Sequence, residues 1–248
     1  MAEISLAGEP VFHLGSWGVP NSVVTTWLVM LVFFVGVFFL RRKKLRSVPK
    51  GFQNFVEAII EFLLNGMKNI VGVHKAYRFF PVVATLFLFI IMSNWFGLFP
   101  GVGSIGFYGE HDGKELFIPF LRSANSDLNT TLALALIAVT TVHLFGILTL
   151  GFKSHVSKYV MNPIKHNIMS AVGILELFGE VSRIISFSFR LFGNIFAGEV
   201  LLIVITGLVA FGAPVPFYFL ELFVGFVQAL VFAMLTLVFL TLATEEHH

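Results

Sequence analysis

The sequence predicts an all-α, polytopic membrane protein with about five membrane-embedded helices, one interfacial amphipathic helix and a long, strongly tilted hairpin formed by the last two helices. Of its 248 residues, 57% are hydrophobic and 12% are charged, and the mean hydropathy is +0.90. Soluble domains hold about 25% charged residues. Apolar segments of spanning length recur along the chain, with basic residues clustered between them. No stretch resembles a soluble core, so residues 1–248 are predicted to form a single membrane domain.

The first predicted span covers residues 22–40, which are almost wholly apolar and uncharged. They match the roughly 20 residues needed to cross a bilayer core. The run RRKKLRSVPK follows at residues 41–50, where six of ten residues are basic. Such a run is typical of a solvated loop beside lipid headgroups, and nucleic-acid binding is the weaker interpretation. By the positive-inside rule this loop marks the cytoplasmic side.

Residues 52–72 are predicted to form an amphipathic helix that lies along the cytoplasmic interface. Apolar side chains recur there at helical spacing, and polar side chains take the other face. If this segment spanned the bilayer, too many charges would face lipid. The apolar face comprises Phe52, Phe55, Val56, Ile59, Ile60, Leu63, Met67, Ile70 and Val71.

The second crossing is predicted over residues 81–99, starting at Pro81 and ending in the turn FGLFPG. Residues 101–127 are predicted to form a loop. Its GVGSIG run matches the glycine pattern of dinucleotide sites, but no predicted strand precedes it, so we do not interpret it as a nucleotide site. Asp127 or Asn129 is expected to cap the next helix.

The third crossing is predicted over residues 128–150 and contains His143. A lone histidine among apolar residues is more often a hydrogen-bonded structural group than a proton relay, and both interpretations stay open. Twelve of the 16 basic residues lie in segments assigned to the cytoplasmic side, and only Lys114 and Arg122 lie in the opposite loop. This asymmetry predicts an external N-terminus and, after five crossings, a cytoplasmic C-terminus.

The last two predicted helices cover residues 168–210 and 217–243. No proline interrupts the first of them, so it could extend for about 65 Å at roughly 1.5 Å per residue. That length is about twice the hydrocarbon thickness of a bilayer. The helix must therefore be bent, broken or strongly tilted, and strong tilt requires protein packed against it.

Polar side chains form a stripe on each of these two helices. At about 100° per residue, positions seven apart share a face, and Ser186 and Asn194 lie within about 40° of Arg190. Glu180 lies at the edge of this stripe, and Glu199 projects from the opposite side. The members spaced by seven are Glu176, Arg183 and Arg190 on the first helix, and Glu221 and Gln228 on the second.

An arginine at the centre of a membrane helix costs about 2.5–3.5 kcal/mol on insertion scales, so Arg190 requires an explanation. Intramembrane charges usually pair with one another. For Glu176, Glu180 and Arg183, the sequence supports structural pairing and a functional role to the same extent. For Arg190, pairing within the chain is the weaker interpretation, because few carboxylates are available to it.

Two sequence runs make a family resemblance specific. SFRLFGNIFAGE, with the later helix VQALVFAMLTLVFLTLATEEH, resembles subunit a of the F-type ATP synthases, the stator channel of a membrane rotor. The resemblance extends over most of the chain, including SNWFGLFPG and DLNTTLALAL. A lone arginine in an apolar helix would be weak evidence, whereas RLFGN with the glutamine-bearing helix is strong evidence.

The resemblance implies roles for individual residues. Arg190 matches the essential arginine of the family, with Asn194 as its partner, Ser186 one turn before it and Gln228 facing it. Glu199 and Glu221 match the pair in the outer half-channel, and Glu176 matches the acidic group of the cytoplasmic half-channel. In relatives one member of the outer pair is often histidine, and two close carboxylates would exchange protons as a coupled pair.

The expected function is that of a non-catalytic, proton-translocating stator subunit in a bacterial inner membrane. The resemblance implies a c-subunit rotor ring, a b-subunit peripheral stalk and membrane lipid as partners, with no nucleic acid and no cofactor. The chain has no phosphate-binding loop. A secondary transporter would favour an inverted repeat, which the sequence does not display, and an intramembrane enzyme would need a motif such as H-E-x-x-H, which is also missing.

Overall fold

The computed structural model describes residues 8–14, 17–42, 47–99, 101–102, 105–111, 114–153, 167–209 and 212–245. Within them the chain is predominantly helical, which confirms the all-α class. Five of the described helices are long and apolar enough to cross a membrane. The helices are α1 (Asn21–Arg42), α2 (Phe52–Val71), α3 (Val73–Phe96), α4 (Leu128–Leu150), α6 (Asn167–Leu208) and α7 (Pro214–Thr244).

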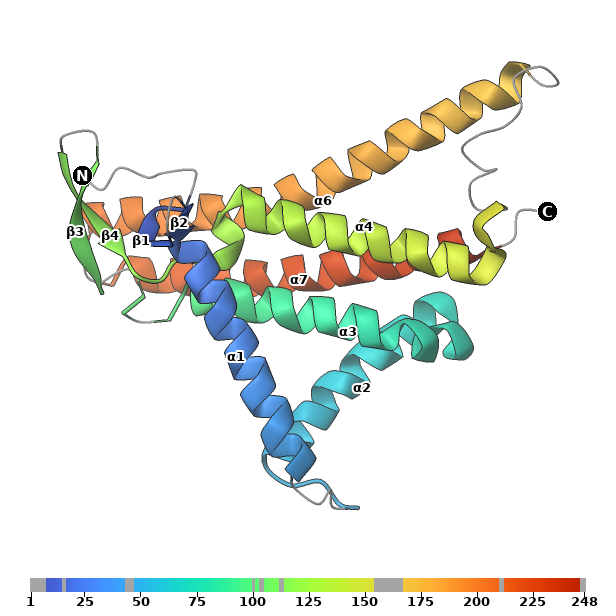
Figure 1. The fold of residues 1–248 in the computed structure, drawn as a ribbon. Helices are drawn as coiled ribbons and strands as arrows, with labels where there is room; N and C mark the ends of the chain where they lie inside the picture. The colour runs from blue at the N-terminus through green and yellow to red at the C-terminus, as the bar shows by residue number, and fades with distance from the viewer. Residues whose placement is uncertain are drawn as a thin grey trace.

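Two β-hairpins lie at one end of the helices (Figure 1), and the second of them falls in residues 101–127, which the sequence predicted to be a loop. The hairpins pair β1 (Pro10–Leu14) with β2 (Trp17–Pro20), and β3 (Gly106–His111) with β4 (Lys114–Pro119), both antiparallel. A short helix, η1 (Ala124–Ser126), follows. Gly106 therefore begins a hairpin strand, and its glycine-rich run is not part of a dinucleotide-binding unit.

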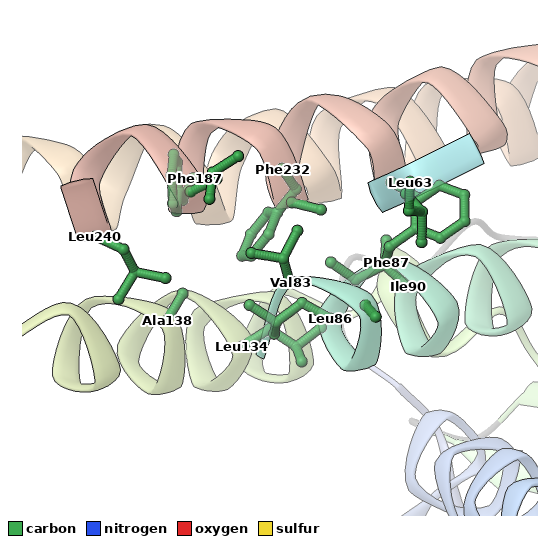
Figure 2. Close-up of a cluster of buried hydrophobic side chains, with 14 of the residues drawn as sticks. Leu63, Val83, Leu86, Phe87, Ile90, Leu134, Ala138, Phe187, Phe232 and Leu240 are labelled. Atoms are coloured by element: carbon green, nitrogen blue, oxygen red, sulfur yellow. The ribbon is translucent and has the colours of Figure 1, made fainter. Parts of the chain in front are cut away.

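A bundle of α3, α4, α6 and α7 forms the centre of the molecule (Figure 1). Its core is a continuous cluster of aliphatic and aromatic side chains contributed by all four helices and by α2. Figure 2 shows part of this cluster, with Phe187 of α6 and Phe232 of α7 near leucines of α3 and α4. Gly225 brings α7 close to α3, because a Cβ there would lie 3.2 Å from the Cβ of Asn94.

Helix α3 begins eight residues before the predicted start at Pro81, which lies inside the helix. Ala76 and Phe79, both upstream of the proline, are fully buried in the core. Proline removes one backbone hydrogen bond from a helix. The packing of these upstream side chains stabilises the helix on both sides of that missing bond.

Helices α1 and α2 lie at the margin of the bundle. Only the first part of α1 is buried, through Asn21, Ser22, Thr25 and Val29, and the rest extends away from the other helices (Figure 1). Helix α2 buries Leu63 and Met67. It is strongly amphipathic, as expected.

Helix α6 is continuous over 42 residues. Its first part diverges from α4 and α7, whereas its second part lies along them (Figure 1). The buried side chains Phe187, Leu191, Ile195 and Leu202 form the contact face of that second part. The helix is therefore unbroken, and it lies at an angle to α4 along its first part.

Candidate functional site

Arg190 lies near the middle of α6, on the face directed away from the bundle. Its side chain is exposed, and its Nη2 donates a hydrogen bond to Ser186 Oγ at 3.1 Å. No carboxylate forms an ion pair with Arg190 among the residues that the structure describes. The serine one turn earlier thus orients the guanidinium without neutralising it.

The surface around Arg190 is open and carries small residues. Gly179 and Gly193 lie within about 60° of Arg190 on the helix, and a Cβ added at either glycine would meet no atom within 4 Å. Ala197 is also exposed on this face. The small residues therefore leave room for another surface to approach the arginine closely.

Asn194 and Gln228 connect α6 to α7. Asn194 Nδ2 donates to Gln228 Oε1 at 2.7 Å, and Gln228 is only 5% exposed. The Nε2 of Gln228 is buried and has no hydrogen-bond partner among the described residues. An unsatisfied buried amide is uncommon. It leaves one donor available beside the arginine-bearing helix.

Glu221 of α7 lies against Gly198 of α6, the residue before Glu199. Glu221 is buried. A Cβ at Gly198 would overlap the Glu221 carboxylate, so the absence of a side chain there allows this approach. Glu199 also accepts hydrogen bonds from Arg122 Nε, at 2.9 Å to Oε1 and 3.1 Å to Oε2. The two carboxylates and the arginine form one charged cluster.

The segment that carries Arg122 forms a buried polar layer between the helices, in a region that the sequence predicted to be a loop. Asp127 caps α4 by accepting from Asn129 N–H at 2.9 Å, as predicted, and also accepts from Ser22 Oγ at 2.7 Å. Asn125 Nδ2 donates to Asn94 Oδ1 at 2.7 Å, and Asn94 Nδ2 donates to the carbonyl of Gly225 at 2.9 Å. This network joins α1, α3, α4 and α7.

A second charged cluster connects α6 to α4. Arg183 Nη1 donates to both oxygens of Glu180 at 2.8 Å, and His143 Nε2 lies 3.4 Å from Glu180 Oε2. The Arg183 guanidinium also stacks 3.8 Å from the ring centroid of Phe239. Glu176, one turn before Glu180, is half-buried and has no hydrogen-bond partner among the described side chains. This arrangement favours structural pairing for Glu180 and Arg183.

The structure thus divides the predicted site residues into three groups along α6. Arg190 and Ser186 lie on the exposed face, and Asn194 bridges to Gln228. The acidic residues other than Glu176 belong to clusters on either side. Arg122 was missed as a member, because its partner lies 77 residues away in sequence. The sequence feature that could have identified Arg122 is a basic residue beside a run of small polar residues in the outer loop.

The described part of the chain has no group of three or more histidine, aspartate or glutamate residues that could hold a metal ion.

Comparison with known proteins gives a consistent result over nearly the whole chain. Residues 23–241 match the family model described as ATP synthase A chain. A relative named ATP synthase subunit a from Gloeobacter violaceus is 36% identical over 249 residues, covering 100% of this chain and 93% of the relative. Relatives of the same name from Geotalea uraniireducens and Moorella thermoacetica are 34% and 30% identical, and cover 97% and 96% of this chain and 93% and 96% of their own length.

Proposed function

The chain belongs to the ATP synthase A chain family, and we propose that it is the stator subunit that carries protons through the membrane sector of a rotary F-type ATP synthase. As a member of this family it is a multi-pass membrane subunit and not the catalytic component of the complex. The observation that carries the proposal is the exposed Arg190, which has no counter-charge among the described residues of its own chain.

Arginine has the chemistry that a barrier between two proton paths requires. It stays protonated under all physiological conditions, so it attracts a carboxylate but does not relay protons. A charge left without a partner at membrane depth is costly. An acidic side chain on a partner that passes Arg190 would supply the missing charge, and the small residues beside Arg190 would let that partner come close.

Two offset half-channels complete the proposed mechanism. The outer path leads to the cluster of Glu199 and Glu221, and the inner path passes Glu176 and the cluster of Glu180, His143 and Arg183. Because Arg190 separates the two paths, a proton crosses only when the partner carboxyl moves from one path to the other. Each elementary charge that moves through 100 mV contributes about 2.3 kcal/mol to this motion.

The partner proposed for the Arg190 face is the c-subunit rotor ring. The exposed surfaces of α1 and α2 leave room for the b-subunit peripheral stalk and for lipid. The basic residues Arg41 and Arg42 end α1, which supports a cytoplasmic position for that end by the positive-inside rule. We therefore place the protein in a bacterial inner membrane with its N-terminus outside and its C-terminus in the cytoplasm.

The decisive test is Arg190→Ala in membranes that contain the assembled complex. We expect ATP synthesis and ATP-driven proton pumping, normalised to the amount of complex, to fall by roughly 100-fold or more, because the rotor carboxylate loses its charged partner. The control is Arg42→Ala, which removes an exposed arginine from the end of α1. Coupled synthesis at the wild-type rate in Arg190→Ala would overturn the proposal.

A further inference from the structure

The backbone of Arg122 is held in place by contacts of the segment that carries it, independently of the Arg122 side chain. Residues 122–127 are all buried. The backbone N–H of Arg122 donates to Thr25 Oγ1 at 3.3 Å, and Ser123 Oγ donates to the carbonyl of Ser93 at 3.3 Å. These contacts hold the segment against α1 and α3. The guanidinium therefore extends toward α6 from a fixed backbone.

The contact of Arg122 with Glu199 takes place in a region largely closed to solvent. The Arg122 side chain is 8% exposed and the Glu199 side chain is 27% exposed. Hydrogen bonds between ionised groups are stronger than neutral ones. Because a buried guanidinium does not lose its proton, Arg122 presents a permanent positive charge and a fixed donor to this carboxyl group.

The two carboxyl groups of the cluster have different surroundings. Both oxygens of Glu199 share the single Nε–H of Arg122 in a bifurcated hydrogen bond, whereas Glu221 has no hydrogen-bond partner among the described residues. Glu221 nevertheless lies against Gly198, next to Glu199 in the chain. Two neighbouring carboxylates repel each other. A fixed cation beside one of them offsets this repulsion and holds that carboxylate in one orientation.

From this geometry we propose that Arg122 is a positioning residue of the outer proton path. It orients the Glu199 carboxylate and supplies its counter-charge, which allows Glu199 to lie beside Glu221 without being displaced from the path. This role rests on the proposed function of the chain as a proton-translocating stator. It adds a residue of the outer loop to a path otherwise assigned to α6 and α7.

The test measures passive proton conduction through the membrane sector, per assembled complex, after the catalytic sector has been removed. We expect Arg122→Gln to lower conduction about tenfold, because the charge-assisted contact is lost. Arg122→Lys, which restores the charge, should recover a large part of this loss. Glu199→Asp shortens the side chain and moves the carboxylate away from Arg122 while leaving the loop intact, and it should lower conduction several-fold.

The matched control is Lys75→Gln, which removes the exposed 2.7 Å pair with Glu245 and should leave conduction unchanged.

Several outcomes would overturn the role of Arg122. If Arg122 only stabilises the fold, Arg122→Gln will reduce the amount of complex but leave conduction per complex within about twofold of wild type. If Arg122→Gln does not assemble, normal conduction in Glu199→Asp refutes the proposal. Loss of coupling in Arg190→Ala with normal conduction in Arg122→Gln would refute this inference alone. Retained coupling in Arg190→Ala would instead refute the proposed function.

Discussion

Arg190 and Arg122 place the same functional group in opposite surroundings. Arg190 is exposed on a membrane helix, with Ser186 as its neighbour and no ion pair among the described residues. Arg122 is buried and paired with Glu199 at 2.9 Å. The second arginine has its counter-charge within the chain, whereas the first does not. The difference is what the proposed function requires, since that function gives Arg190 a partner from outside this chain.

The glycines near the two arginines follow the same division. A Cβ at Gly198 would overlap the Glu221 carboxylate, so this glycine is in close contact with another part of the chain. A Cβ at Gly193 would meet nothing within 4 Å. The first glycine is therefore constrained by the buried cluster, whereas the second lies on the open face where the proposed partner would approach Arg190.

The largest effect among the glycine and asparagine variants is expected from Gly198→Ala. The atoms in the way belong to the end of the Glu221 side chain, so the fold can accommodate the methyl group only by moving that carboxylate. Proton conduction per complex should fall about tenfold while the amount of complex changes little. Gly36→Ala on α1, where nothing lies within 4 Å, is the control. Equal conduction in the two variants would contradict the role of the buried cluster.

A smaller, several-fold effect is expected from Gly193→Leu. The larger side chain fits the isolated chain, since the site is open, but it would obstruct a surface that approaches Arg190. ATP-driven pumping by the assembled complex should therefore drop while the thermal stability of the purified subunit stays the same. Gly36→Leu provides the same substitution at another open glycine. If both variants pump equally well, the face around Arg190 is not a partner surface.

The smallest effect on transport, but a measurable one on stability, is expected from Asn94→Ala. This buried amide donates to Gly225 and accepts from Asn125, so its loss leaves buried polar groups unsatisfied. The free energy of unfolding should fall by about 1–3 kcal/mol, seen as a lower midpoint in thermal unfolding of the purified protein. Asn194→Ala, on the exposed side of α6, should destabilise less. The reverse order would contradict the larger contribution of the buried polar layer to stability.

The helices could be predicted closely because the signal is local. Helix α2 was predicted over residues 52–72 and covers Phe52–Val71, and the long helix predicted over 168–210 covers Asn167–Leu208. Hydrophobic periodicity and apolar length are properties of contiguous residues. The cap at Asp127 could be predicted for the same reason, since it acts two residues away.

The errors arose where distant contacts decided the outcome. Pro81 predicted a helix start, but burial of Ala76 and Phe79 in the core extends α3 upstream. The hairpin of β3 with β4 lies in a segment that was predicted as a loop, because its short strands carry little alternation of apolar and polar residues. In each case packing or strand pairing outweighed the local preference.

The sequence by itself determined the class of the protein, the long helices, the polar stripe that contains Arg190 and the resemblance to its family, because each depends on residue type and spacing along one helix. Only the tertiary structure decided which charges are paired. Helical periodicity places Glu199 on the side opposite Arg190, but the partner on that side, Arg122, comes from a loop 77 residues away. Charge pairing depends on distances in space, and these are set by how the helices pack.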